Sequence, residues 1–231
     1  MPTVVLVRHG RTTANASGVL AGRTAGVRLD DTGQGQVDRA GERLAAVPLS
    51  AVVTSPMERC RQTAEAILTR QTTAPELAIE AGLDECDYGD WQGQKLKDLA
   101  QDDLWKVVQS APSSVTFPGG ESMATMQRRA VEAVRRIDAE QDEHAVWAAV
   151  SHGDIIKSVL ADALGMHLDL FQRITVDPAS ISIVRYGTGR PHVAAMNTHA
   201  GDLSWLVHRP QQDGASDDAA VGGGAGPSTP S

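Results

Sequence analysis

Short runs of apolar residues alternate along the chain with longer stretches in which apolar positions recur at helical spacing. The short runs predict β-strands and the longer stretches predict helices. Strands are expected at residues 3–7, 50–55, 145–150, 180–186 and 192–197. Helices are expected at residues 33–47, 56–70, 94–109, 121–141 and 155–164. This alternation predicts an α/β fold, a three-layer α/β/α sandwich in which helices cover both faces of a mostly parallel sheet.

Two of the expected helices carry signals at their ends. Ser55 would be the N-cap of the helix at residues 56–70, with Pro56 as its first residue and Glu58 as its third, which is a capping box. Gly165 is expected just past the end of the helix at residues 155–164. These signals predict where the two helices begin and end.

The C-terminal segment, residues 209–231, differs in composition from the rest of the chain. It is rich in Gly, Ser, Pro, Asp and Ala and holds a single Val. Such a segment buries too little apolar surface to offset the entropy lost on ordering. We therefore expect a disordered tail at residues 209–231 and one catalytic domain at residues 1–208.

Charge and cysteine content narrow the class of protein. The net charge is −8 and Lys and Arg form no run, which argues against a nucleic-acid partner. A signal-peptide pattern is not visible, and no apolar run approaches the ~20 residues that span a membrane. We expect a cytoplasmic protein with no membrane contact. Cys60 and Cys86 lack the spacing of metal ligands and are interpreted as reduced structural thiols.

Three predicted strands end in residues that suit an anion. They are Arg8, His9 and Gly10 after the first strand, Arg59 after the second, and Ser151, His152 and Gly153 after the third. In an open α/β sheet, ligands bind outside the carboxyl ends of the strands, so these groups should meet there. Two like charges about 4 Å apart repel by about 4 kcal/mol at an effective dielectric of about 20. A bound phosphate would relieve that repulsion between Arg8 and Arg59 and would match their guanidinium groups.

The ordered set of motifs resembles the histidine phosphatase superfamily, which includes cofactor-dependent phosphoglycerate mutases and many phosphatases. The resemblance rests on V-R-H-G-R-T at 7–12, Ser55-Pro56 with Arg59 and Thr63, and Ser151-His152-Gly153. Further matches are Asn15, Leu29-x-x-x-Gly33-x-x-Gln36, Leu83-x-Glu85, Gly89-x-Trp91-x-Gly93 and Pro118-Gly119-Gly120-Glu121-Ser122. The likeness extends over most of residues 3–206 and implies a phosphoglycerate mutase-like fold. It looks closest to the small bacterial branch of phosphatases and mutases.

The sequence departs from the family pattern at four places, of which Arg11 and Gln92 leave the substrate open. Arg11 stands where many relatives have Glu, and Gln92 stands where Glu is usual. Asp30 replaces a common Thr, and residues 197–203 match the closing N-x-x-x-H-L only loosely.

The resemblance implies that His9 is the nucleophile and forms a phosphohistidine. The two arginines should lower the pKa of His9 and keep it neutral. Glu85 would protonate the leaving oxygen and later activate water. The groups implied to hold the phosphoryl oxygens are Arg8, Asn15, Arg59, His152 and Gly153. No metal and no cofactor are implied.

The leading hypothesis is a phosphomonoester hydrolase acting on a small phosphorylated metabolite, as a monomer or homodimer. The alternatives are a phosphomutase and a non-catalytic phospho-ligand binding protein. The interval between Glu85 and His152 looks too short for the insertions of phosphoglycerate mutases, which favours the phosphatase. A zinc site at His9 and His152 would lack a third ligand in the pattern.

Two further points stay open in the sequence. Glu85 could be a solvated loop acid, in which case Asp84, Asp87 or Asp90 would be the acid. The segment at residues 86–120 is expected to be a lid. Within it, Leu104 and Trp105 have the spacing of core residues, and the lysines are expected in solvent rather than on a second anionic group. These lysines are Lys95, Lys97 and Lys106.

Overall fold

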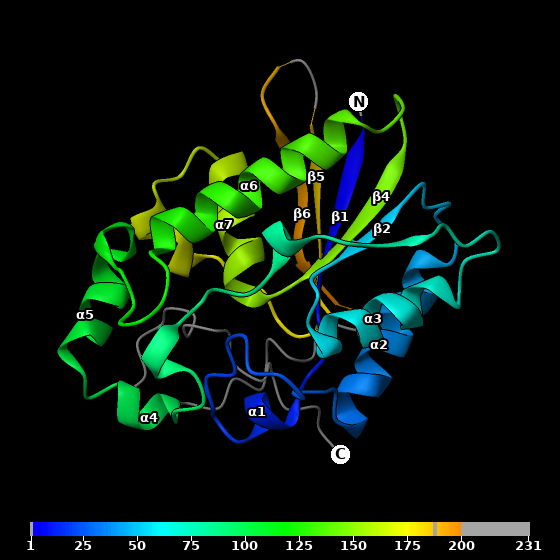
Figure 1. The fold of residues 1–231 in the computed structure, drawn as a ribbon. Helices are drawn as coiled ribbons and strands as arrows, with labels where there is room; N and C mark the ends of the chain where they lie inside the picture. Colours follow the sequence, from blue (N-terminus) through cyan, green and yellow to red (C-terminus); the bar gives the residue numbers. More distant parts are fainter. Residues whose placement is uncertain (1, 187–188, 200–231) are drawn as a thin grey trace, which may run out of the picture.

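A six-stranded sheet forms the centre of the computed structural model, which describes residues 2–186 and 189–199 (Figure 1). The strand order is β3-β2-β4-β1-β5-β6. The strands are β1 (Thr3–Arg8), β2 (Val52–Thr54), β3 (Leu77–Ile79), β4 (Val146–Ser151), β5 (Ile181–Arg185) and β6 (His192–Thr198). Strands β1 to β4 pair in parallel, β5 is antiparallel to β1, and β6 is antiparallel to β5. The predicted, mostly parallel sheet is confirmed.

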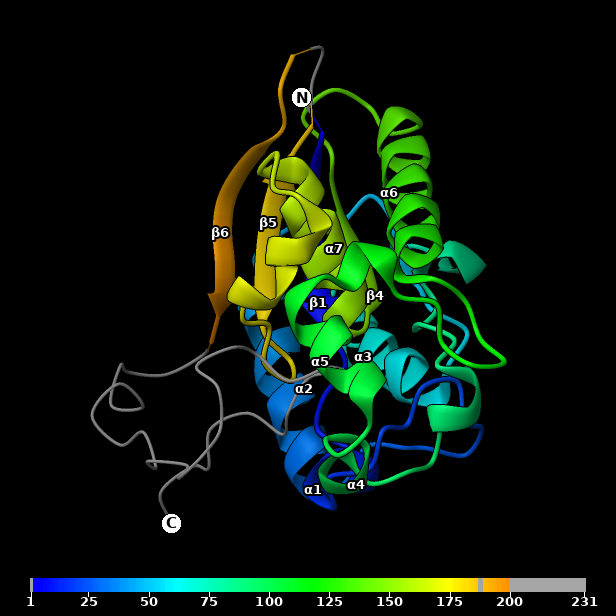
Figure 2. The same ribbon diagram turned by 90° about the vertical axis from the view of Figure 1, so that its left-hand side faces the viewer.

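Helices cover both faces of this sheet, which confirms the predicted three-layer sandwich (Figures 1 and 2). One face carries α2 (Asp31–Leu44) and α3 (Glu58–Leu68), and the other carries α6 (Met123–Ala139) and α7 (Gly153–Ala163). Short helices lie beyond the carboxyl ends of the parallel strands: α1 (Thr13–Ala16), α4 (Leu96–Leu99) and α5 (Asp103–Ser110). Single turns of 3₁₀-helix occur at Ala81–Leu83, Gly89–Trp91 and Pro112–Ser114, and a longer one at Leu168–Arg173.

The alternation of side chains along β1 explains why helices cover both faces of the sheet. Val4 and Leu6 pack into the core shared with α6 and α7, whereas Val5 and Val7 pack into the core shared with α3. Successive side chains of a strand point to opposite faces, so a strand buried on both faces must be apolar throughout. This requirement accounts for the uninterrupted apolar run at residues 3–7.

The predicted capping box at Ser55 is wrong. Helix α3 begins at Glu58, its N-cap is Met57, and no side chain caps it. Ser55 is buried at the end of β2, and its hydroxyl lies 2.8 Å from Nε2 of His152. The Ser55 hydroxyl therefore contacts His152, which lies far away in the sequence, and does not cap the helix as the local pattern predicts.

Two other details differ from the sequence prediction. The helix expected at residues 94–109 is divided into α4 and α5, because Asp102 starts a new helix by accepting a hydrogen bond from the Leu104 N–H at 2.8 Å. Strand β3 was not predicted. It is only Leu77–Ile79, an apolar run too short to predict a strand, and it lies at the sheet edge with Ile79 58% exposed.

The segment at residues 86–120 packs through aromatic side chains. The Trp91 ring stacks on Trp105 with centroids 6.1 Å apart and meets Phe117 edge-on at 5.3 Å. Leu104 and Trp105 pack against the core as predicted, and Lys95, Lys97 and Lys106 are exposed as predicted. That the segment acts as a lid stays a prediction.

The tail predicted at residues 209–231 lies outside the described residues. Within the described part of the chain, no helix is both long enough and apolar enough to cross a membrane.

Candidate active site

The sheet brings the three predicted strand-end motifs together. Strands β1 and β4 are parallel neighbours in which Arg8 pairs with Ser151, so His9 and His152 leave the sheet at the same level. Their ring centroids are 5.3 Å apart, with an interplanar angle of 66°. Strand β2 lies on the other side of β4 and leads into α3, which carries Arg59.

One of the two ring nitrogens of His9 has a hydrogen-bond partner in the protein. Its Nδ1 lies 2.7 Å from the carbonyl oxygen of Gly10, which can only accept, so Nδ1 carries the proton. The lone pair is therefore on Nε2. His9 is buried, and burial followed by the charges of Arg59 and Arg8 holds its pKa well below the ordinary value. The imidazole is thus neutral at neutral pH, as a nucleophile requires.

Gly33 and Gln36 of the family-like pattern support the loop that carries His9. Gly33 lies against this loop, and a Cβ on Gly33 would lie 1.9 Å from the Arg11 carbonyl oxygen. Gln36 accepts a hydrogen bond from the Arg11 N–H at 2.9 Å. On the other side, the Gly10 N–H donates to the Thr63 hydroxyl at 3.3 Å. The family-like residues at these positions therefore fix the loop.

Two of the departures from the family pattern pair with each other. Arg11 donates from Nε to Asp30 at 2.9 Å and from Nη2 to the Thr32 hydroxyl at 2.7 Å. Asp30 also caps α2 by accepting from the Gly33 N–H at 2.7 Å. Neither Arg11 nor Asp30 lines the pocket described below.

Both predicted arginines are buried beside the histidines. Arg8 donates from Nη1 to the Val176 carbonyl at 2.8 Å. Arg59 donates from Nη2 to the Gly22 carbonyl at 2.7 Å, and the same nitrogen lies 3.2 Å from Nδ1 of His152. Among the described residues, the buried Nη1 of Arg59 has no hydrogen-bond partner. A buried charged donor without a partner is costly, and a bound anion would satisfy it.

A pocket opens above these groups. It is lined by His9, Asn15, Arg59 and Glu85 together with Thr12, Val19, Leu20, Ala21, Gly22, Tyr88 and Leu96. The pocket is small: together with the open space at its mouth it occupies about 330 Å³. Arg8, His152 and Gly153 are buried outside this lining, Gly153 as the first residue of α7.

Asn15 is fixed by a local cap. Its Oδ1 accepts hydrogen bonds from the Thr12 N–H at 3.1 Å and from the Thr12 hydroxyl at 2.9 Å. None of the hydrogen bonds found among the described residues uses its Nδ2. Asn15 can therefore offer an N–H donor to a ligand in the pocket.

Glu85 lies in the pocket as a buried carboxyl group. Its Oε1 accepts from the Cys86 N–H at 2.9 Å, and its Oε2 lies 3.9 Å from Nδ1 of His152. Burial, followed by the charge of Asp154, raises the pKa of Glu85 to about 8. Glu85 is therefore protonated at neutral pH and can donate a proton.

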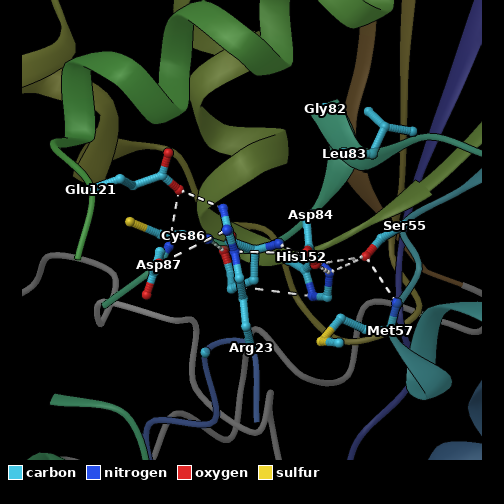
Figure 3. A network of polar contacts seen from close by, with 12 residues as sticks. Arg23, Ser55, Met57, Gly82, Leu83, Asp84, Cys86, Asp87, Glu121 and His152 are labelled. Carbon is cyan, nitrogen blue, oxygen red and sulfur yellow. Dashed lines mark hydrogen bonds and ion pairs between the residues drawn. The ribbon is translucent and has the colours of Figure 1, made fainter. Parts of the chain in front are cut away.

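Two arginines that sequence reasoning did not single out hold the backbone of Glu85. The Glu85 carbonyl accepts from Arg23 Nε at 2.8 Å and from Arg129 Nη2 at 2.9 Å. Both arginines also contact Glu121, Arg23 at 2.9 Å and Arg129 at 2.6 Å (Figure 3 shows Arg23 and Glu121). No motif marks Arg23 in the sequence, and its partners lie far along the chain, so no local signal could have found it.

Gln92, another departure from the family pattern, belongs to the same network. Its Oε1 accepts a hydrogen bond from the Arg23 N–H at 2.6 Å. A carboxylate would accept this bond equally well, so the position serves the turn before Arg23 with either side chain. Gln92 does not line the pocket.

The closing segment of the domain is held by contacts with Asp177. Asn197 accepts from the Asp177 N–H at 2.7 Å, and His199 lies 3.0 Å from the Asp177 carboxylate. Residues 200–203 of the loosely matching segment lie outside the described residues.

The comparison with known families decides the identity. A model described as the histidine phosphatase superfamily (branch 1) matches residues 4–199. The chain belongs to the histidine phosphatase superfamily. The predicted resemblance is thereby confirmed over nearly all of the described part of the chain.

Relatives in this superfamily differ in length and in name. A "bifunctional protein" of Mycobacterium tuberculosis is 31% identical over 84% of this chain, and the match covers 53% of that relative. The chain therefore spans about half the length of this mycobacterial relative. The "adenosylcobalamin/alpha-ribazole phosphatase" of Salmonella typhimurium is 27% identical over 84% of this chain and 96% of its own.

A solved structure shares the fold. Bacillus stearothermophilus YhfR superposes with a TM-score of 0.78 at 29% identity, over 84% of this chain and 96% of that chain. Within the described residues, the structure contains no group of three or more His, Cys, Asp or Glu side chains that could hold a metal ion.

Proposed function

We propose that the protein is a phosphatase that hydrolyses small phosphomonoesters through a phosphohistidine on His9. The observation that carries this proposal is the pairing of two groups in one pocket. His9 has its lone pair on Nε2, and beside it Arg59 Nη1 is buried without a partner among the described residues. A phosphoryl group would satisfy the arginine and receive the attack of the histidine. The relative from Salmonella typhimurium, which is named a phosphatase, supports the assignment.

The first half-reaction transfers the phosphoryl group to the protein. Nε2 of His9 forms a bond to phosphorus while the bond from phosphorus to the leaving oxygen breaks. Glu85 gives its proton to that oxygen, so an alcohol leaves rather than an alkoxide. Arg8, Arg59 and His152 stabilise the charge on the equatorial oxygens, with Asn15 and Gly153 as further donors.

The second half-reaction returns the enzyme to its starting state. Water attacks the phosphorus and gives a proton to Glu85, and the bond from Nε2 to phosphorus breaks. Inorganic phosphate leaves, His9 is again neutral, and Glu85 is again protonated. The balance requires no redox partner.

The small pocket favours a small substrate that contacts a few apolar side chains. Val19, Ala21 and Leu96 are the partly exposed apolar residues of the lining, whereas Leu20 and Tyr88 are buried. Arg11, Asp30 and Gln92 are engaged elsewhere, so the departures from the family pattern do not add a second anion site to this pocket.

Covalent labelling tests this function. Brief incubation with a ³²P-labelled phosphomonoester, followed by denaturation, should leave label that is acid-labile and alkali-stable, as a phosphoramidate is. His9→Ala should abolish the label, whereas the exposed control His167→Ala should retain it. Label that persists in His9→Ala, or that survives acid, would overturn the proposal.

Product analysis separates the alternatives. A phosphatase releases inorganic phosphate in stoichiometric amount, whereas a phosphomutase returns the label to an organic product. A non-catalytic binding protein would do neither. EDTA should leave the rate unchanged, since side chains supply every step of the proposed mechanism.

A further inference from the structure

The hydroxyl of Ser55 joins His152 to Asp84. Ser55 Oγ lies 2.8 Å from Nε2 of His152 and 3.2 Å from Oδ1 of Asp84, and it also accepts from the Met57 N–H at 3.3 Å (Figure 3). Ser55 and His152 are fully buried. Asp84 Oδ1 in turn accepts from the Glu85 N–H at 3.0 Å. The chain of contacts therefore runs from one catalytic group to the backbone of another.

The hydrogen-bonding capacity of each group determines which way the protons point in this series of contacts. A carboxylate only accepts, so the Ser55 hydroxyl donates its proton to Asp84. The oxygen of Ser55 must then accept from His152, which places a proton on Nε2. On the other side of the ring, Arg59 Nη2 lies 3.2 Å from Nδ1 and can only donate. Without a ligand, His152 is thus the Nε2–H tautomer with the lone pair on Nδ1.

This tautomer has the wrong form to bind a phosphoryl oxygen. Nδ1 is the atom near the pocket, since it lies close to Arg59 and 3.9 Å from Glu85. A phosphoryl oxygen accepts hydrogen bonds, so Nδ1 needs a proton to contact it. Ser55 and Asp84 hold the Nε2 proton in place, so the ring cannot simply exchange one tautomer for the other.

We propose that Ser55 and Asp84 are positioning residues that make His152 take up a second proton when a phosphoryl dianion binds. Solvent supplies this proton for a dianion, and a monoanionic ester brings it along. The resulting imidazolium donates from Nδ1 to the phosphoryl oxygen and from Nε2 to Ser55, and Asp84 balances its charge. The inference rests on the proposed function, because it assumes that the pocket binds a phosphoryl group.

The surroundings of His152 keep the ring neutral until the anion arrives. Burial, followed by the charges of Arg59, His9 and Arg8, lowers the pKa of His152 well below its ordinary value. Arg129 on α6 adds to this effect. The facing acidic groups are Asp84 and Glu85, and the thiol of Cys60, 3.5 Å from Nε2, stays neutral because burial raises its pKa to about 12. A dianion among these groups reverses the balance and favours the charged ring.

Nitrogen NMR of the full chain with ¹⁵N-labelled histidine tests the proposal, because ring ¹⁵N shifts report which nitrogens carry protons. The measurements use Glu85→Gln protein at pH 7.5, so that Glu85 does not titrate, and inorganic phosphate as the probe. His152→Gln assigns the resonances. We expect protonation on Nε2 alone without phosphate, and on both nitrogens with saturating phosphate.

Three variants and a control distinguish a positioning role from a purely structural one. Ser55→Ala should populate both tautomers without phosphate, and Ser55→Thr should restore the single tautomer. Asp84→Asn keeps an acceptor for the hydroxyl but removes the charge. It should weaken phosphate binding by ~10-fold, as expected when one pKa unit of charge balance is lost. Asp87→Asn, on the same segment but without a contact to Ser55, should change neither result.

The outcomes distinguish this inference from the proposed function. An Nδ1–H tautomer in the unliganded protein, or a singly protonated His152 in the phosphate complex, would overturn the relay. The ³²P label on His9 would survive either result. Loss of the label with a doubly protonated His152 would instead overturn the covalent mechanism and leave the relay standing.

Discussion

Arg23 donates a hydrogen bond from its Nε to the carbonyl oxygen of Glu85 at 2.8 Å. The residue before Arg23 is Gly22, whose carbonyl accepts from Arg59 Nη2 at 2.7 Å. One turn of the chain therefore contacts both Arg59, the proposed phosphate-binding arginine, and the segment of Glu85, the proposed general acid. This connection explains why a half-exposed arginine outside every recognised motif should matter for catalysis.

Replacing Arg23 should impair proton donation more than phosphate binding. We expect Arg23→Ala to lower kcat/KM by ~10-fold or more with an alkyl phosphate, because displaced catalytic groups cost rate steeply. The loss should be smaller with p-nitrophenyl phosphate, whose leaving group needs little protonation. Steady-state assays on both substrates measure this difference, and Arg61→Ala, an exposed arginine on α3, is the control. Equal losses on both substrates would show that Arg23 acts on the phosphate site instead.

The sequence predicted the residues whose position follows from strand order and strand ends. Arg8, His9, Arg59 and His152 each follow or lie near the end of a strand, and adjacent parallel strands bring such ends together. The apolar run at residues 3–7 required a doubly covered sheet. These features depend on local pattern and on general rules of α/β topology.

The features that were missed depend on contacts between distant residues. Ser55 matched a capping pattern over four positions, but its hydroxyl bonds His152, 97 residues away. Arg23 and Glu85 are 62 residues apart and share no motif. Strand β3 is only Leu77–Ile79, and an apolar run of this length does not by itself predict a strand. Tertiary contacts decide these cases, and a single sequence does not encode them locally.

A substitution at Gly33 tests how closely α2 must approach the loop that carries His9. A Cβ at this position would lie 1.9 Å from a backbone oxygen, which cannot move as a flexible side chain can. We expect Gly33→Ala to destabilise the protein by ~1–3 kcal/mol, in the range of overpacked sites. Urea denaturation measures the change. Gly35→Ala, two residues along the same helix and with only the Arg39 side chain nearby, should change stability little.

A substitution in the pair formed by Arg11 and Asp30 tests whether these departures from the family pattern determine substrate specificity. Their ion pair is partly exposed, and such pairs contribute ~0–1 kcal/mol. Arg11→Glu, which introduces the residue common in relatives, should therefore lower stability slightly and leave the order of preferred substrates unchanged. A panel of sugar phosphates, phosphoglycerates, nucleotides and phosphoamino acids measures that order. A reordered panel would show that Arg11 contacts the substrate.

The role of Glu85 as general acid can be tested through the leaving group. Glu85→Gln keeps the shape of the side chain but cannot deliver a proton. Phosphorylation of His9 should slow by ~10²–10⁴-fold with an alkyl phosphate and much less with p-nitrophenyl phosphate. Single-turnover rates are needed, because water attack on the phosphohistidine can also slow. Equal losses on both substrates would mean that Glu85 only positions other groups, and Asp84, Asp87 or Asp90 would become candidates for the acid.

The raised pKa of Glu85 also predicts how stability depends on pH. The pKa is about 8 in the folded protein against an ordinary value of 4.5, so the folded state binds more protons between these two values. The contribution that Glu85 makes to the free energy of unfolding is therefore fully present below about pH 4.5. It falls across this interval and is lost as pH rises through about 8. The lowered pKa values of His9 and His152 act in the opposite sense, since they reduce stability as pH falls below about 6.5.

Comparing variants isolates the contribution of Glu85 from that of the histidines. Glu85→Gln cannot ionise, so its Tm relative to the unmodified protein should rise from pH 5 to about pH 8 and level off above that pH. Differential scanning calorimetry across this range measures the difference, and Glu132→Gln, an exposed position on α6, should show no trend. A difference that stays constant with pH would mean that Glu85 is ionised throughout the range. In that case it could not protonate the leaving oxygen in the first half-reaction at neutral pH.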